Sequence, residues 1–150
     1  MKLSVRSEYA LRALMALAEA TDGGLLRIQA IAERQRIPKR FLEQILNDLR
    51  SGGFVESRRG VTGGYRLARP AQSITVREVV EYLEVPGAGN APASGTRPEA
   101  REAADEVLQE VWSLARSALL EALQRWTIAS LCERAHELRR QRGELMDFVI

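Results

Sequence analysis

Residues 58–67 read Arg58-Arg59-Gly60-Val61-Thr62-Gly63-Gly64-Tyr65-Arg66-Leu67, and this stretch decides the predicted fold. Its three glycines permit positive φ angles and a sharp chain reversal. We therefore expect a β-hairpin with strands over Phe54–Ser57 and Tyr65–Ala68. The two arginines then lie at the tip of a short β-ribbon, where they can reach a phosphate backbone or a minor groove.

Three helical segments precede the hairpin. Apolar residues recur at helical spacing in Ser4–Ala20, in the shorter segment Leu26–Gln35 and in Pro38–Ser51. The turn Arg36-Ile37-Pro38 separates the last two segments, and Pro38 suits the first position of the third helix. This order of elements predicts a helix-turn-helix followed by a hairpin.

The third predicted helix has two unlike faces. Its apolar residues follow the i, i+3, i+4, i+7 spacing of a buried stripe, namely Leu42, Ile45, Leu46 and Leu49. Polar residues repeat that spacing on the opposite face, namely Arg40, Glu43, Gln44 and Asn47. Such a helix can enter a major groove, whereas the alternative is an ordinary solvated surface. The tight turn before it and the arginine hairpin after it favour a winged helix-turn-helix domain that binds DNA.

The second half of the chain predicts further helices. Thr75 and Glu78 form a capping-box pattern that opens one helix, and Thr127 can cap the last one. Between them, Val85–Pro98 is rich in Pro and Gly and predicts a flexible loop. A long helix begins near Pro98. Its apolar residues alternate steps of three and four, namely Ala104, Val107, Val111, Leu114 and Ala118. That seam favours pairing with a second copy, although packing on its own domain is the alternative.

We therefore expect a mainly α fold with a small β-hairpin wing, in three parts. These are a winged helix-turn-helix DNA-binding domain over 1–84, a flexible loop over 85–98, and a dimerisation helix with a C-terminal helix over 99–150. Residues 1–69 hold 13 Lys and Arg against 7 Asp and Glu, a net charge of +6, whereas residues 70–150 carry −4. A basic front half fits a nucleic-acid binder, although an ordinary uneven surface gives the same totals.

The sequence lacks the residues that other classes of function require. The sequence shows no Ser, Cys or His triad, and the glycines at 60–64 lack the lysine of a phosphate-binding loop and lead into a strand, so we expect no enzyme. The lone Cys132 excludes a disulfide or an all-cysteine metal site within one chain. The most apolar run, Ala10–Ala20, is too short to span a bilayer, which predicts a cytoplasmic protein with no membrane partner.

Seven motifs, taken in order, resemble the IscR/NsrR/CymR family of bacterial regulators. They are Met1-Lys-Leu-Ser4, Tyr9-Ala-Leu-Arg-Ala-Leu14, Ile31-Ala-Glu-Arg-Gln35, Phe41-Leu-Glu-Gln44, Arg59-Gly60, Gly63-Gly-Tyr-Arg-Leu-Ala-Arg-Pro70 and Ile74-Thr-Val-Arg-Glu-Val79. The likeness is close over residues 1–84 and looser over 99–132. It implies a dimeric winged-helix transcription factor, often a repressor, that binds a roughly palindromic operator in double-stranded DNA through two recognition helices and two wings. A module that kept this fold for protein interactions is the alternative.

The resemblance also implies roles for single residues. Glu43 and Gln44 would meet base edges in the major groove, and Arg59 would enter the minor groove. Lys39 and Arg40 would hold phosphate or bases, and Arg6 and Arg58 are weaker candidates for phosphate contact. The predicted DNA-contact set is Lys39, Arg40, Glu43, Gln44, Asn47, Arg58, Arg59 and Gly60.

The chain departs from the family at two turn positions. Arg36 stands where glycine is usual in the helix-turn-helix turn, and a left-handed backbone there would cost arginine about 1 kcal/mol or more. Arg27 stands where a Ser or Thr cap is more usual. Both changes add positive charge near the DNA, so we expect them to add phosphate contacts.

A third departure concerns the cofactor. Many members of the family bind an iron–sulfur cluster through three cysteines in the loop before the long helix, but residues 85–98 hold no cysteine. We therefore expect no cofactor; a cluster on Glu8, Cys132 and His136 is the remote alternative. The protein would then bind DNA constitutively, respond to a small molecule or partner protein, or sense oxidation through Cys132.

Overall fold

A computed structural model describes residues 3–20, 24–84 and 102–143 of the chain. Its helices are α1 (Val5–Ala18), α2 (Ile28–Gln35), α3 (Lys39–Ser51), η2 (Ala71–Ser73, a 3-10 helix), α4 (Val76–Glu84), α5 (Ala103–Gln124) and α6 (Ile128–Gln141). The strands β1 (Val55–Arg58) and β2 (Gly64–Leu67) pair as one antiparallel hairpin. The expected mainly α fold with a β-hairpin wing is therefore confirmed. None of the helices in the described ranges combines the length and apolar character needed to cross a membrane.

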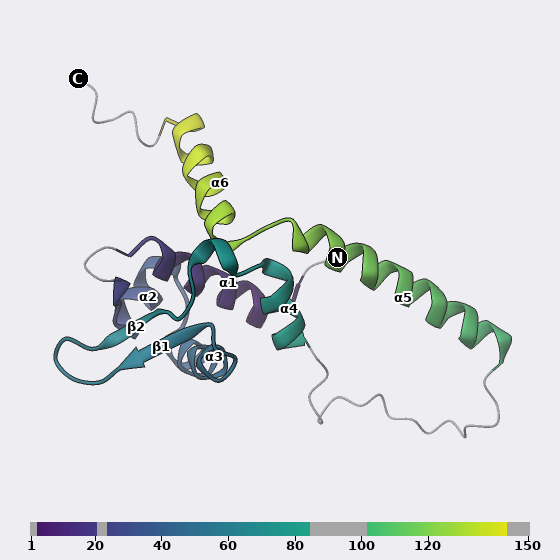
Figure 1. The fold of residues 1–150 in the computed structure, drawn as a ribbon, viewed down its shortest axis with the longest axis horizontal. Coiled ribbons are helices and arrows are strands. Elements are labelled where there is room, and N and C mark those ends of the chain that lie inside the picture. Colours follow the sequence, from purple (N-terminus) through teal and green to yellow (C-terminus); the bar gives the residue numbers. More distant parts are fainter. Residues whose placement is uncertain (1–2, 21–23, 85–101, 144–150) are drawn as a thin grey trace.

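Helix α1 lies at the centre of the fold. It packs against α2, α3, α4, α6 and strand β2, and its alanines permit close approach of these neighbours (Figure 1). Its largest buried side chain, Leu14, is fully excluded from solvent, as are Leu42 and Leu46 on α3. Burial of such side chains supplies about 1.5–3 kcal/mol each, so this cluster holds α3 against α1.

Several element boundaries differ by one or two residues from the sequence-based expectation. Helix α2 begins at Ile28 instead of Leu26, because Leu26 pairs with Tyr65 beside the hairpin through N···O distances of 2.8 and 2.7 Å. Pro38 caps α3 and is not its first helical residue, since its ψ angle is 126°. Its carbonyl still accepts hydrogen bonds from the first turn of α3. Both strands also lie one residue away from the predicted ranges.

The turn between α2 and α3 is left-handed at Arg36, which has φ 52° and ψ 47°. Within the described residues, Arg36 is the one non-glycine residue with a positive φ. The turn still closes well, because the Ile37 amide donates to the Ala32 carbonyl at 3.0 Å and the Ile37 side chain is 3% exposed. The conformational strain expected from the sequence is therefore present.

Both predicted helix caps are confirmed. The Thr75 hydroxyl accepts from the Glu78 amide, and the Glu78 carboxylate accepts from the Thr75 amide, each at 3.1 Å. Thr127 forms the same reciprocal arrangement with Ser130 at 3.1 and 2.8 Å. The two caps also lie together, since the Ile128 amide donates to the Ile74 carbonyl at 2.9 Å. This pairing holds the start of α6 beside the start of α4.

A second polar network joins the first and fourth helices. The buried Ser7 hydroxyl donates to the Glu84 carboxylate at 2.7 Å, and the Ser4 hydroxyl donates to the same oxygen. Hydrogen bonds from Ser4 and Ser7 hold the pKa of Glu84 below its ordinary value. The last residue of α4 is thereby anchored to the start of α1.

Helix α5 extends outward from this body and contacts it through α4, and its N-terminal end points away from the other helices (Figure 1). It begins at Ala103, later than the expected start near Pro98. None of the residues of α5, all of which the structure describes, is buried. The predicted loop over 85–98 lies outside the described residues, so the division into three parts stays a prediction.

Replacement of Arg36 by glycine tests the strained turn. We expect Arg36→Gly to raise the free energy of unfolding by about 0.5–1 kcal/mol, because relief of ~1–2 kcal/mol of left-handed strain exceeds the added backbone entropy of glycine. Urea denaturation followed by circular dichroism measures the change. Arg34→Gly removes the same charge from within α2 and should lower stability by about 1 kcal/mol. Equal losses in both variants would contradict the assignment of strain to Arg36.

Candidate nucleic-acid interface

Helix α3 presents the two faces that its sequence predicts. Leu42, Leu46 and Leu49 are fully buried and Ile45 is 3% exposed. Every predicted contact residue on this helix is exposed, namely Lys39, Arg40, Glu43, Gln44 and Asn47. The structure therefore brings these five side chains together on the solvent side of one helix.

The N-terminal end of α3 is strongly positive. Lys39 and Arg40 occupy its first turn, and that turn contains no acidic residue in the described helix. Cations there are unfavourable beside the positive end of the helix dipole. A bound phosphate would reverse this balance, because exposed amide groups and both cations then face an anion. The two cations in the first turn of α3 would therefore be more stable beside the phosphate backbone of a nucleic acid than in the free protein.

The hairpin carries the remaining predicted contact residues. Arg58 ends β1 opposite Gly64, and Arg59 and Gly60 lie exposed at the turn, beyond the paired strands. In Figure 1 the turn projects away from the helices. A ribbon of this shape can place its tip arginine beside a duplex while α3 meets the adjacent groove.

Two glycines are required by close backbone contacts. A Cβ at Gly64, where φ is +149°, would lie 2.6 Å from the Leu26 carbonyl oxygen. A Cβ at Gly63 would lie 2.3 Å from the Arg58 carbonyl oxygen. Gly60 and Gly64 use the positive φ angles that their sequence permits, whereas Gly63 does not, and close packing within the tip is the reason for glycine there.

Arg27 ties the hairpin tip to α2. It is the N-cap residue of α2, and its side chain makes no capping hydrogen bond within the described residues. Its guanidinium instead donates to the Val61 carbonyl in the hairpin turn. Arg27 therefore positions the tip, which the sequence did not suggest; the phosphate contact expected of it stays a prediction.

Arg50 is a further residue that sequence reasoning missed. Its guanidinium donates to the Asn47 side-chain oxygen at 2.8 Å and to the Ser57 hydroxyl at 3.2 Å. It therefore joins the polar face of α3 to strand β1. The i, i+3 spacing of Asn47 and Arg50 is visible in the sequence, but their link to Ser57 depends on how the hairpin folds back on α3.

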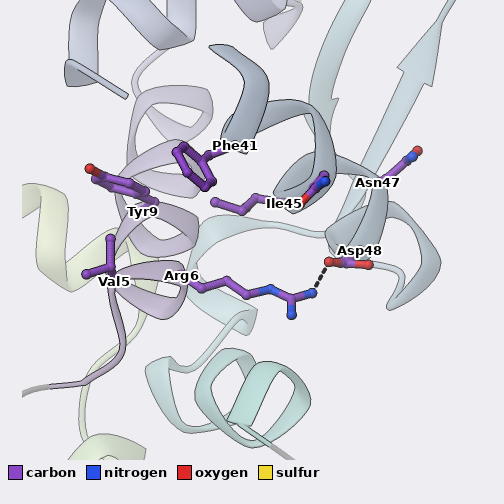
Figure 2. A pocket seen from close by; sticks show the side chains of 8 residues that line it. Val5, Arg6, Tyr9, Phe41, Ile45, Asn47 and Asp48 are labelled. Carbon is purple, nitrogen blue, oxygen red and sulfur yellow. Dashed lines mark hydrogen bonds and ion pairs between the residues drawn. The ribbon is translucent and has the colours of Figure 1, made fainter. Parts of the chain in front are cut away.

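Arg6 lies on α1 and faces α3. Its guanidinium forms an ion pair with the Asp48 carboxylate, which joins α1 to α3 (Figure 2). The side chains remain 52% and 40% exposed. The weaker prediction that Arg6 contacts phosphate is untested, but the structure adds a partner, Asp48, that holds this arginine beside α3.

The residues present do not fit a cluster held by three thiolates. The chain has one cysteine. Among the described residues, which include Glu8, Cys132 and His136, no three His, Cys, Asp or Glu side chains gather to hold a metal ion. The Cys132 thiol instead lies 3.7 Å from the Met15 carbonyl oxygen, and burial, reinforced by Glu19, raises its pKa to about 11.

Comparison with known proteins finds related sequences and a similar fold. A family described as "Rrf2: Iron-dependent Transcriptional regulator" matches residues 3–134. The regulator IscR of Cereibacter sphaeroides is 45% identical over 86 residues, or 56% of each chain. The regulator CymR of Bacillus subtilis is 30% identical over 131 residues, which span 87% of this chain and 89% of CymR. The solved structure of T. potens IscR superposes with a TM-score of 0.73 at 30% identity, covering 93% of this chain and 91% of that one.

The raised pKa of Cys132 gives a testable pH dependence. Below pH 11 the thiol stays largely protonated, and the thiolate is the reactive form. We expect iodoacetamide to alkylate native Cys132 roughly tenfold more slowly at pH 8 than the same cysteine in urea-unfolded protein. The rate should keep rising up to pH 10, with circular dichroism checking that the fold persists. An alkylation rate that stops rising below pH 9 would show that the Cys132 thiol has a low pKa, and would support oxidation sensing by this residue.

Proposed function

This chain belongs to the Rrf2 family of DNA-binding transcriptional regulators, and we propose that it is a homodimeric repressor of a palindromic operator. The observation that carries the proposal is the exposed polar face of α3 beside the basic hairpin tip. Its relatives regulate transcription, and we propose a regulatory instead of a catalytic role. We also propose the division into a DNA-binding domain (1–84), a linker (85–98) and a dimerisation part (99–150).

We propose that α3 contacts base edges in the major groove while the hairpin tip binds in the minor groove. The Glu43 carboxylate can accept from cytosine N4, and the Gln44 amide can pair with adenine. Arg59 at the exposed tip suits the narrow, negative minor groove. Lys39 and Arg40 would neutralise phosphates at the end of α3, which makes affinity fall steeply with salt.

We propose that α5 forms the dimer interface. Large apolar side chains along it are exposed, namely Val107 at 55%, Leu108 at 52%, Val111 at 49%, Trp112 at 65% and Leu114 at 72%. A contiguous apolar strip of this kind usually marks an interaction surface. Two copies joined along α5 would present two α3 helices, which matches two half-sites about one helical turn, or a multiple of it, apart.

The regulatory input is proposed to be a small molecule or a partner protein. The single cysteine does not fit a cluster of three thiolates, and the Cys132 thiol has a raised pKa. Both observations support a member of the family that responds without an iron–sulfur cluster and without thiol oxidation.

Binding to an operator selected from random duplexes tests the interface. We expect Arg59→Ala to weaken binding about tenfold, or ~1.4 kcal/mol, because a minor-groove cation is lost. Glu43→Ala should instead relax the base preference at one position of each half-site. Fluorescence anisotropy on the selected operator and on singly substituted duplexes measures both effects.

The matched control for these variants is Arg134→Ala. Arg134 lies on α6, exposed and paired with Glu137 at 3.1 Å, so its loss should leave operator affinity unchanged. Equal affinity for the Arg59→Ala and Arg134→Ala variants would overturn the role of the hairpin tip. An unaltered base preference after Glu43→Ala would show that Glu43 does not read sequence.

Charge placed on the apolar seam tests the dimer. We expect Val111→Glu with Leu114→Glu to raise the dimer dissociation constant more than about 100-fold, because two apolar side chains would lose their burial between subunits. Both side chains are exposed in the single chain, so its fold should survive. Analytical ultracentrifugation measures the change. Gln109→Glu, on the opposite side of α5, is the control, and a variant that stays dimeric would place the interface elsewhere.

A further inference from the structure

A groove of about 670 Å³ runs between α1 and α3, beside the polar face of the recognition helix. Figure 2 shows its two unlike ends. Apolar side chains gather at one end, and the ion pair between Arg6 and Asp48 lies at the other. Grooves of this size are typical of small-molecule sites, in which an apolar wall is combined with a few polar groups.

The apolar end leaves large side chains in contact with water. Phe41 is 57% exposed and Val5 is 61% exposed, while Ile45 and Tyr9 complete the wall beneath and beside them. Exposure of two such side chains at one place is unfavourable in the single chain. An aromatic or branched aliphatic group of moderate size would cover them.

The polar end offers one positive and one negative group. Arg6 and Asp48 supply the charged groups of the groove lining, so its formal charges cancel. Their side chains are 52% and 40% exposed, and an ion pair this accessible to solvent contributes little to stability. A ligand with a carboxylate and an ammonium group can therefore replace it, with the carboxylate on Arg6 and the ammonium on Asp48.

We propose that this groove binds a free α-amino acid with an aromatic or branched apolar side chain. The charged backbone groups of the ligand lie between Arg6 and Asp48, and its side chain lies against Phe41 and Val5. An acid alone would leave Asp48 unpaired beside a second anion, and an amine alone would leave Arg6 unpaired. The zwitterion is the charge state that satisfies both partners.

The groove also shares residues with the face that we propose reads DNA. Gln44 and Asn47 line it, and Asn47 is already held by Arg50 at 2.8 Å. A ligand in the groove would contact these two side chains and compete with their approach to base edges. We infer that the amino acid weakens operator binding, a step that rests on the proposed function, whereas binding of the amino acid itself does not.

Calorimetric titration of the full chain without DNA tests the site first. The probes are L-phenylalanine and L-leucine, with 3-phenylpropionate, 2-phenylethylamine and glycine as partial ligands that lack the ammonium, the carboxylate or the side chain. We expect at least one of the two amino acids to bind at least about tenfold more tightly than every partial ligand. Absence of binding by both, or equal binding of a partial ligand, would overturn the proposal.

Variants then locate the site. Arg6→Gln and Asp48→Asn should each weaken amino-acid binding at least about tenfold, and Phe41→Ala should weaken it as well. Arg12→Gln is the matched control, because Arg12 lies on α1 and pairs with Glu8 at 3.2 Å with similar exposure. Affinities that are the same in all four variants would put the ligand elsewhere and overturn the assignment.

Operator binding separates this inference from the proposed function. If L-phenylalanine binds and releases the operator, both stand; if it binds and the chain has no operator at all, the site stands and only the proposed function fails. If Phe41→Ala changes the oligomeric state or weakens operator binding while no amino acid binds, a second subunit or a DNA strand covers the groove, and the proposal is wrong.

Discussion

The burial of one face of α3 against α1 is the constraint on which the rest of the structure depends. Leu42, Leu46 and Leu49 are fully buried in the core that α3 shares with α1, and each contributes about 1.5–3 kcal/mol through burial. A turn of α3 by one residue, about 100°, would expose part of this stripe and bury charged side chains. The rotation of the helix is therefore fixed, and so is the set of side chains that it presents to solvent.

The hairpin depends on contacts outside its own strands. Two paired strands of four residues are marginal alone in water. Three links stabilise this pair, namely the backbone pairing of Leu26 with Tyr65, the hydrogen bond from Arg27 to the Val61 carbonyl, and the bridge from Arg50 to Ser57. Because these links start from the residues just before α2 and from α3, the tip is positioned relative to the helix that we propose reads bases.

The residues of this chain do not fit a regulatory cluster held by three thiolates. The family is described as iron-dependent, yet the chain has one cysteine, and burial raises the pKa of that thiol to about 11. The groove between α1 and α3 combines exposed apolar side chains with an ion pair of low stability. It lies against α3, the helix that we propose reads bases, so a ligand there would act directly on Gln44 and Asn47.

Much of the fold and of the candidate interface could be predicted from the sequence by itself, because its signals are local. Helical periodicity determined the two faces of α3, and the spacing of Thr75 and Glu78 determined a cap that the structure confirms. Only the tertiary structure decided which distant groups meet. Three examples join residues from different parts of the chain. They are the pairing of Leu26 with Tyr65, the ion pair of Arg6 with Asp48, and the contact of the Cys132 thiol with the Met15 carbonyl. Such contacts depend on how helices and strands pack in space, and periodicity within one segment carries no information about them.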